Sequence, residues 1–219
     1  MFIVDCSLLA DYCLLFTVDW IMIGIIDYKL NNLRSVQKAF EKVGAASFIS
    51  SDPKELARSE KLVLPGVGTF RKAMENIYSL NLEEMIRAHV AHGKPLIGIC
   101  LGMQLLFTRS YENGAHDGLN FINGEVKLFP NSVKVPHIGW NQVEIRRQSK
   151  ILTSVVNNSF VYFVHSYYAE PKEDVTLTTT EYGFHFASVV QRENVFGIQF
   201  HPEKSQVAGL QMLKNFSEL

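Results

Sequence analysis

The chain has 219 residues, 47% of them hydrophobic and 20% charged, which suffices for the core of one sizeable domain. Its formal net charge is -1, so the sequence lacks the basic surplus that binds nucleic acid or an anionic membrane surface. The three cysteines, Cys6, Cys13 and Cys100, are too few for a disulfide framework and lack metal-ligand spacing. They favour a reducing, cytoplasmic setting and imply no metal.

The first 21 residues are predicted to form an extension ahead of a single domain that spans 22–219. The segment is apolar, but Asp5, Asp11 and Asp19 interrupt it, and it contains no Lys or Arg. A secretory signal needs a basic start, and a membrane span needs about 18 or more uncharged apolar residues. Neither pattern is present, so the sequence predicts no membrane insertion and leaves the role of the extension open.

Short apolar runs alternate with helical patterns through the first half of the domain. Strands are predicted at 22–26, 46–49, 61–64 and 95–99. Helices are predicted at 33–43, 70–91 and 101–108, and a further helix start is predicted at Asp52-Pro53. This alternation implies right-handed crossovers and a largely parallel sheet with helices on both faces.

The second half contains short segments rich in β-branched and aromatic residues. They predict strands at 143–145, 160–164, 175–180, 187–191 and 195–199, followed by a closing helix at 206–216. Antiparallel strands added to the sheet or beside it fit this pattern. The predicted fold class is therefore α/β, an open and mostly parallel sheet flanked by helices, with antiparallel strands in the C-terminal half.

The strongest local motif is Gly98-Ile99-Cys100-Leu101-Gly102, between a predicted strand and a predicted helix. It has the glycine–nucleophile–glycine pattern of a sharp strand-to-helix turn, which exposes the central side chain at the edge of a sheet. A helix N-terminus favours the thiolate form of cysteine, and the N–H of Leu101 could donate to an oxyanion. The alternative is a buried structural cysteine between two glycines.

A second motif, Phe200-His201-Pro202-Glu203, follows the predicted strand at 195–199. A cysteine nucleophile needs a base, and the base needs an orienting partner. In extended backbone His201 and Glu203 point to the same side, so this spacing can place a carboxylate against an imidazole. The alternative is a proline-containing surface turn.

The third motif is Pro65-Gly66-Val67-Gly68, which also ends a predicted strand. Glycines there allow backbone N–H groups to approach a ligand, although an ordinary turn is the simpler interpretation. All three motifs lie at the C-terminal ends of predicted strands, where open α/β sheets place their sites. The other polar or helical histidines are predicted to be solvated: His89, His92, His116 and His185. A solvated face is likewise predicted for Arg146, Arg147 and Lys150.

Together these motifs resemble those of class I (triad) glutamine amidotransferases, which have a flavodoxin-like fold. Within that class, Pro65-Gly66-Val67-Gly68 and the segments 135–141 and 164–168 resemble the glutaminase subunits of imidazole glycerol phosphate synthase. The resemblance extends from about residue 22 to the C-terminus. It implies a catalytic triad in which Cys100 attacks the glutamine carboxamide, His201 transfers protons and Glu203 orients His201.

The same resemblance implies the surroundings of the triad. Backbone N–H groups of Val67, Gly68 and Leu101 would form the oxyanion hole. The glutamine pocket would be lined by Gln104, His165, Ser166 and Tyr167. Ammonia would pass to a (β/α)8-barrel cyclase subunit, in a heterodimer that acts in histidine biosynthesis without a cofactor. The interface with that subunit would include Asn32, Pro136, His137, Trp140 and Asn141.

The first loop of the domain departs from the family pattern. Family members often carry glycines there, whereas Asp27-Tyr28-Lys29-Leu30-Asn31-Asn32 contains none, and a lysine adopts a left-handed conformation less readily than asparagine. Two alternatives stay open at this point. One keeps the triad but serves another ammonia acceptor, and the other keeps the fold as a binding module without turnover.

Overall fold

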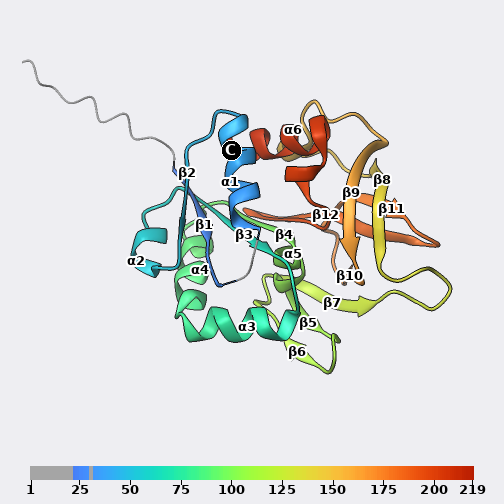
Figure 1. Cartoon of the computed structure of the whole chain (residues 1–219), viewed down its shortest axis with the longest axis horizontal. Coiled ribbons are helices and arrows are strands. Elements are labelled where there is room, and N and C mark those ends of the chain that lie inside the picture. Colours follow the sequence, from blue (N-terminus) through green and yellow to red (C-terminus); the bar gives the residue numbers. More distant parts are fainter. Residues whose placement is uncertain (1–21, 30–31) are drawn as a thin grey trace, which may run out of the picture.

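The computed structural model describes residues 22–29 and 32–219, so the predicted extension lies outside the described part. A nine-stranded sheet runs through the molecule in the order β2-β1-β3-β4-β13-β12-β11-β8-β9 (Figure 1). Its first five strands pair in parallel: β2 (Ser47–Ser50), β1 (Ile23–Ile26), β3 (Lys61–Gly66), β4 (Leu96–Cys100) and β13 (Val195–Ile198). All of these strands except β2 are buried along their whole length, as expected for a parallel sheet covered on both faces.

The other half of the large sheet is antiparallel, and β9 forms its edge. It consists of β12 (His185–Arg192), β11 (Thr176–Glu181), β8 (His137–Ile145) and β9 (Ser159–His165). These strands match four of the five strands predicted in the second half, at 143–145, 160–164, 175–180 and 187–191, whereas the predicted strand at 195–199 is β13, which pairs in parallel with β4. The α/β fold class and its C-terminal antiparallel addition are therefore confirmed.

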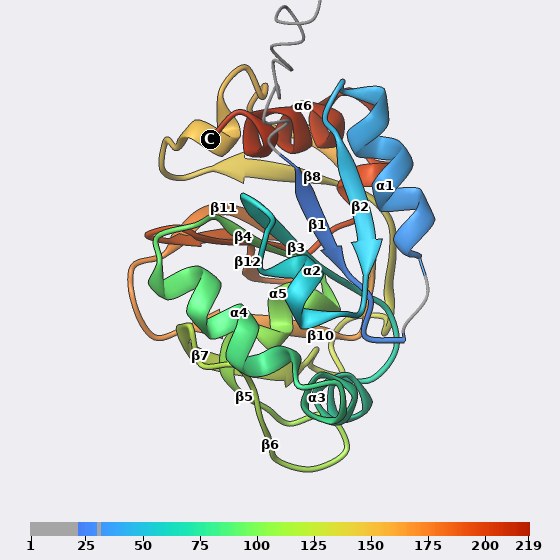
Figure 2. The same cartoon turned by 90° about the vertical axis from the view of Figure 1, so that its left-hand side faces the viewer.

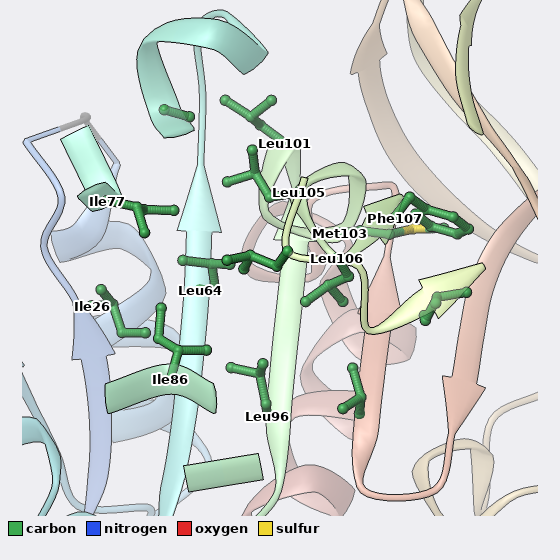
Figure 3. Packing of buried hydrophobic residues seen from close by; sticks show 14 of the residues in the cluster. Ile26, Leu64, Ile77, Ile86, Leu96, Leu101, Met103, Leu105, Leu106 and Phe107 are labelled. Atoms are coloured by element: carbon green, nitrogen blue, oxygen red, sulfur yellow. The ribbon is translucent and has the colours of Figure 1, made fainter. Parts of the chain in front are cut away.

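Helices cover both faces of the parallel half (Figure 2). On one face α1 (Leu33–Lys42) packs against α6 (Gln206–Ser217). The opposite face carries α2 (Pro53–Leu56), α3 (Phe70–Ser79), α4 (Leu82–Ala91) and α5 (Leu101–Leu105). The buried side chains form two clusters, one with each helical layer. Figure 3 shows the second of these layers, where Ile26, Leu64 and Leu96 of the strands meet side chains of α3, α4 and α5.

The predicted helix at 70–91 is wrong as a single element. The structure has α3 and α4 with a break at Leu80 and Asn81, where Asn81 takes a left-handed conformation at φ 55°. The predicted helix at 101–108 is also too long, because α5 ends at Leu105 and a strand begins at Phe107. In both places the apolar pattern continues across a change of chain direction, so the pattern alone does not indicate the end of the helix.

A second, four-stranded sheet lies beside the large one and is absent from the predicted elements. Its order is β10 (Tyr167–Pro171), β7 (Ile122–Leu128), β5 (Phe107–Ser110) and β6 (His116–Asp117). Strand β9 of the large sheet ends at His165, and β10 of the small sheet begins at Tyr167, so a single residue, Ser166, joins the two sheets.

The prediction that His89 is solvated is wrong, because only 4% of its surface is exposed. Its Nε2 lies 3.1 Å from the carbonyl oxygen of Pro95, and burial lowers the pKa of its imidazole to about 4. The solvated face is confirmed for Arg146, Arg147 and Lys150, which are exposed. No helix within the described ranges is long and apolar enough to cross a membrane.

Candidate active site

Cys100 occupies a sharp turn between β4 and α5. Its backbone angles are φ 54° and ψ -111°, a conformation that non-glycine residues rarely adopt. The flanking glycines make the turn possible, because a Cβ atom at Gly102 would lie 1.7 Å from the carbonyl oxygen of Leu64. A Cβ atom at Gly98 would lie 2.5 Å from the carbonyl oxygen of Gly102. The two glycines thus let helix, turn and strand pack at backbone contact, with the strained cysteine held at the helix N-terminus.

His201 and Glu203 form an ion pair next to this turn. His201 follows β13, the parallel neighbour of β4, and its Nδ1 lies 2.8 Å from Oε1 of Glu203. Each side chain is only 1% exposed. Asn32, at the start of α1, donates from Nδ2 to the same carboxylate oxygen at 2.7 Å. Two donors therefore meet at one oxygen of the carboxylate, and the other ring nitrogen of His201, Nε2, has no hydrogen-bond partner in the described residues.

The electrostatics of the pair favour a charged imidazole. Burial lowers the pKa of His201, but the neighbouring Cys100 side chain and the Glu203 carboxylate together raise it to about 10. Burial raises the pKa of Glu203, but the contacts with His201 and Asn32 outweigh this effect, so the net shift is downward. At neutral pH this arrangement holds an imidazolium between a carboxylate and the cysteine sulfur.

Cys100 and His201 open into a shared cavity of about 340 Å³. All seven residues predicted for the oxyanion hole and the glutamine pocket line it: Val67, Gly68, Leu101, Gln104, His165, Ser166 and Tyr167. They come from the ends of β3 and β9, from the start of α5 and from the start of β10. A cysteine, a histidine and several polar residues thus surround one space of substrate size.

Two further residues near the site are not among the predicted site residues. Glu112 lies in the loop after β5 and lines the cavity, where its carboxylate accepts a hydrogen bond from the N–H of Phe70 at 2.5 Å. Tyr28 is fully buried, and its hydroxyl donates to the carbonyl oxygen of Pro65 at 2.5 Å, directly below the oxyanion segment. Burial raises the pKa of Tyr28 above its ordinary value, so it stays a donor.

The five residues predicted for a partner interface do not lie together on one surface of the structure. Asn32 belongs to the triad through its bond to Glu203, and Pro136 lines the cavity. His137 is 3% exposed and faces the interior of the sheet, whereas Trp140 is 46% exposed on the outer face of β8. Asn141 is half-buried and donates to the ring of His137.

A larger hollow of about 520 Å³ lies between α2 and α4 and includes His89 and His92. None of the predicted catalytic or pocket residues lines it, and it contains no serine, threonine or cysteine. Across 22–29 and 32–219, no group of three or more His, Cys, Asp or Glu side chains is placed to hold a metal ion. The cavity at Cys100 is therefore the candidate active site.

Comparisons with known proteins agree with this geometry. Residues 25–218 match the family described as glutamine amidotransferase class-I. A solved glutamine amidotransferase superposes with a TM-score of 0.72 at 15% identity and covers 90% of this chain and 99% of its own. The chain belongs to the class-I glutamine amidotransferases.

Two curated relatives narrow the assignment. The HisH subunit of imidazole glycerol phosphate synthase from Aquifex aeolicus is 52% identical over 194 residues, which cover 88% of this chain and 94% of that protein. The HisH subunit from Syntrophotalea carbinolica is 50% identical over 206 residues, 90% of this chain and 100% of that protein. Within its class, the chain belongs to the HisH subunits of imidazole glycerol phosphate synthase, the glutaminase subunits of that enzyme.

Proposed function

We propose that the chain hydrolyses glutamine through a thioester on Cys100 and releases the ammonia for a partner subunit. The observation that carries this proposal is the buried His201–Glu203 pair beside a cysteine in a strained strand-to-helix turn. The cationic imidazole of His201 lies beside the cysteine sulfur that would act as the nucleophile.

In the first step the Cys100 sulfur attacks the carboxamide carbon of glutamine, and a C–S bond forms while the carbonyl oxygen becomes an oxyanion. The N–H groups of Val67, Gly68 and Leu101 are the proposed donors to this oxygen. The C–N bond then breaks, and His201 gives its proton to the departing nitrogen, which leaves as ammonia. Water attacks the thioester carbon and gives a proton to His201. The C–S bond then breaks, so that glutamate is released and the Cys100 sulfur is free for the next cycle.

Substrate recognition follows from the polar groups of the cavity. Gln104 uses its amide nitrogen for Tyr167 O and Gln199 Oε1, both at 3.0 Å, which leaves its amide oxygen to accept from the substrate. Glu112 adds a carboxylate that complements the α-ammonium group of glutamine. These two acceptors select an amino acid over a simple amide.

The proposed partner is a (β/α)8-barrel cyclase subunit, supported by the names of the relatives, which are subunits of imidazole glycerol phosphate synthase. Ammonia would react there with a phosphoribulosyl aminoimidazole carboxamide compound. The products would be imidazole glycerol phosphate and an aminoimidazole carboxamide ribotide, in histidine biosynthesis. A reducing cytoplasm suits this chemistry, because Cys100 is a free thiol.

The outer face of β8 and β9 is the proposed docking surface for this partner. Strand register places three residue pairs side by side there, namely Ile138 with Val164, Trp140 with Tyr162 and Gln142 with Phe160. Ile138, Trp140 and Phe160 are 59%, 46% and 57% exposed. Large apolar side chains gathered on an exposed sheet face mark a protein interface.

The proposal is tested by glutamate release from glutamine, measured with and without the purified cyclase subunit and its nucleotide ligand. Replacing Cys100 by Ala should reduce turnover of the complex below detection, whereas replacing Cys6 or Cys13 by Ala should leave it unchanged. Full activity of the Cys100→Ala chain would refute the mechanism. Activity of the wild-type chain without stimulation by the cyclase would keep the mechanism and indicate another acceptor.

A further inference from the structure

The link between the two sheets forms one wall of the glutamine cavity. His165 ends β9, Tyr167 begins β10, and both line the cavity together with Ser166. Strand pairing holds both ends of this link, His165 opposite His137 and Tyr167 opposite Leu128. Two further contacts lie within it, since Phe129 N donates to Ser166 O at 3.1 Å and His165 Nδ1 lies 2.8 Å from Tyr167 O. The shape of the pocket wall therefore depends on the ring of His165.

The hydrogen bonds around His165 have only one consistent order of protons. A carbonyl oxygen can only accept, so His165 Nδ1 carries a proton for Tyr167 O, and in the neutral ring Nε2 is an acceptor. His137 Nδ1 lies 3.1 Å from that Nε2 and must donate to it. His137 Nε2 is then an acceptor, and Asn141 Nδ2 donates to it at 3.3 Å. Asn141 is fixed in turn by a bond from the same nitrogen to Glu181 O at 2.9 Å.

Both rings are held neutral by their surroundings. Burial lowers the pKa of His137 to about 4 and is the main cause that lowers the pKa of His165 to about 3. The His137 ring stacks on Tyr182 at 4.0 Å and on Phe163 at 4.8 Å between centroids. Charged imidazoles would put two donors face to face, so the order of protons requires neutral rings.

The chain of bonds ends at the substrate side of the cavity. Tyr167 O accepts from His165 Nδ1 and from Gln104 Nε2, which occupies both of its lone pairs. The second proton of Gln104 Nε2 goes to Gln199 Oε1, so the orientation of the Gln104 amide is fixed. Because the amide oxygen of Gln104 is the proposed acceptor for glutamine, its placement depends on the carbonyl of Tyr167.

We propose that His137 is a positioning residue for glutamine binding: by donating to His165 it holds the Tyr167 carbonyl and the Gln104 amide in the substrate-binding arrangement. His137 touches no substrate in this scheme and acts only through His165. The inference rests on the proposed glutaminase function, since Gln104 matters here as a ligand for glutamine. It assigns His137 to the pocket instead of the partner interface.

The kinetic test compares replacements of His137 by Leu and by Asn in the complex with the cyclase subunit. Leu removes the donor to His165, whereas the Asn amide places an N–H close to the position of Nδ1. We expect His137→Leu to raise the KM for glutamine about fivefold to tenfold with kcat within about twofold, and His137→Asn to stay within about twofold of wild type, since one hydrogen bond contributes about 1 kcal/mol. An unchanged KM in His137→Leu, or equal defects in both variants, would overturn the proposal.

Val143→Ala provides the control, because Val143 is fully buried on the same face of β8 and takes no part in the bond chain. It should lower the thermal midpoint as His137→Leu does and leave the KM unchanged. An equal rise in KM there would show that loosening of β8 suffices, and would also overturn the proposal.

A second measurement does not depend on turnover. Two-bond ¹H–¹⁵N spectra of the wild-type chain should show both His137 and His165 protonated at Nδ1. A proton on Nε2 of either ring would contradict the bond order and refute the inference. If the wild-type complex releases no glutamate at all, the proposed function fails, while this spectrum still decides the order of protons.

Discussion

Lys29 takes a backbone conformation that glycine adopts at no cost. Its φ is 63°, and its N–H donates to Asp27 Oδ1 at 2.8 Å. This conformation costs a residue with a side chain about 1 to 2 kcal/mol. Glycine removes that cost, but it also increases the conformational freedom of the unfolded chain, which cancels part of the gain. We expect Lys29→Gly to raise the free energy of unfolding by about 0.5 to 1 kcal/mol in urea denaturation.

Lys29→Ala separates this effect from loss of the lysine charge, because alanine keeps the Cβ atom that causes the strain. Its free energy of unfolding should remain within about 0.5 kcal/mol of the wild-type value. A stability gain as large as that of glycine would mean that the side chain, and not the backbone angle, is unfavourable at this position.

Cys100 and Glu203 together favour the protonated form of His201. The pKa of His201 lies at about 10, above the ordinary value of about 6.5, so its cation is favoured across the neutral range and is lost as pH rises toward 10. Without the cation, His201 has no proton to give to the departing ammonia, so kcat/KM should fall along an alkaline limb of the pH–rate profile. In Glu203→Gln the negative charge is absent, the pKa of His201 drops, and the limb should move to lower pH. A pH–rate profile measures the shift, and an unmoved limb would exclude His201 as the acid.

The same shift links pH to stability. Because the folded state binds the His201 proton more tightly than the unfolded chain, the protonation of His201 contributes its full stability below about pH 6.5. That contribution is lost as pH rises from there toward 10. Glu203 has a lowered pKa, so its contribution is present at neutral pH and is lost on acidification. We expect the alkaline decrease of unfolding free energy to be smaller in Glu203→Gln than in the wild type.

At the scale of elements, the contact of α5 with β3 depends on the absence of a side chain at residue 102. Alanine is the better helix former, yet its Cβ would lie 1.7 Å from Leu64 O and would force α5 away from the sheet. We expect Gly102→Ala to lower the free energy of unfolding by about 2 to 3 kcal/mol and to reduce glutaminase activity, because α5 carries Leu101 and Gln104.

Gly44→Ala is the matched control for Gly102→Ala. Residue 44 has φ 81°, and no atom of another residue would lie within 4 Å of a Cβ atom there, so the variant reports only the backbone cost of about 1 to 2 kcal/mol. Unfolding by urea and glutamate release measure both variants. Retention of activity in Gly102→Ala would show that α5 shifts without displacing the site.

The sequence predicts those elements whose local pattern agrees with their tertiary role. The five parallel strands and α1, α2 and α6 carry uniform apolar runs or clear helix signals, and three motifs at strand ends converge because parallel strands share one C-terminal edge. The sequence does not separate α3 from α4, because the helical spacing of apolar residues continues across the break at Asn81. Glu112 and Tyr28 are not predicted as site residues, because each bonds to a backbone atom far away in the sequence. These atoms are Phe70 N for Glu112 and Pro65 O for Tyr28.

At the scale of the whole molecule, the fold places its chemistry and its exposed apolar face on neighbouring elements. Strand β9 carries Phe160 and Tyr162 on the outer face, Val164 and His165 at the cavity, and a backbone contact from His201 N to Tyr162 O at 3.0 Å. A partner bound to that outer face would lie close to the glutamine pocket, because neighbouring residues of β9 reach both. Ammonia released at Cys100 would then have a short way to travel.

Trp140 lies in the middle residue pair of this face and is 46% exposed. Aromatic residues at the centre of an interface often contribute about 2 kcal/mol or more to binding. We expect Trp140→Lys to raise the Kd for the cyclase subunit by about thirtyfold or more in titration calorimetry, because it buries a charge in an apolar contact.

Val207→Lys is the control for this substitution, since Val207 is an exposed apolar residue on α6, at 81% exposure, outside the β8–β9 face. Its Kd should match the wild-type value. Both variants should keep the wild-type thermal midpoint, because each side chain is solvated in the free chain. If Val207→Lys weakens binding and Trp140→Lys does not, the partner docks on the α6 side, and ammonia would have to pass around the His201–Glu203 pair to reach it.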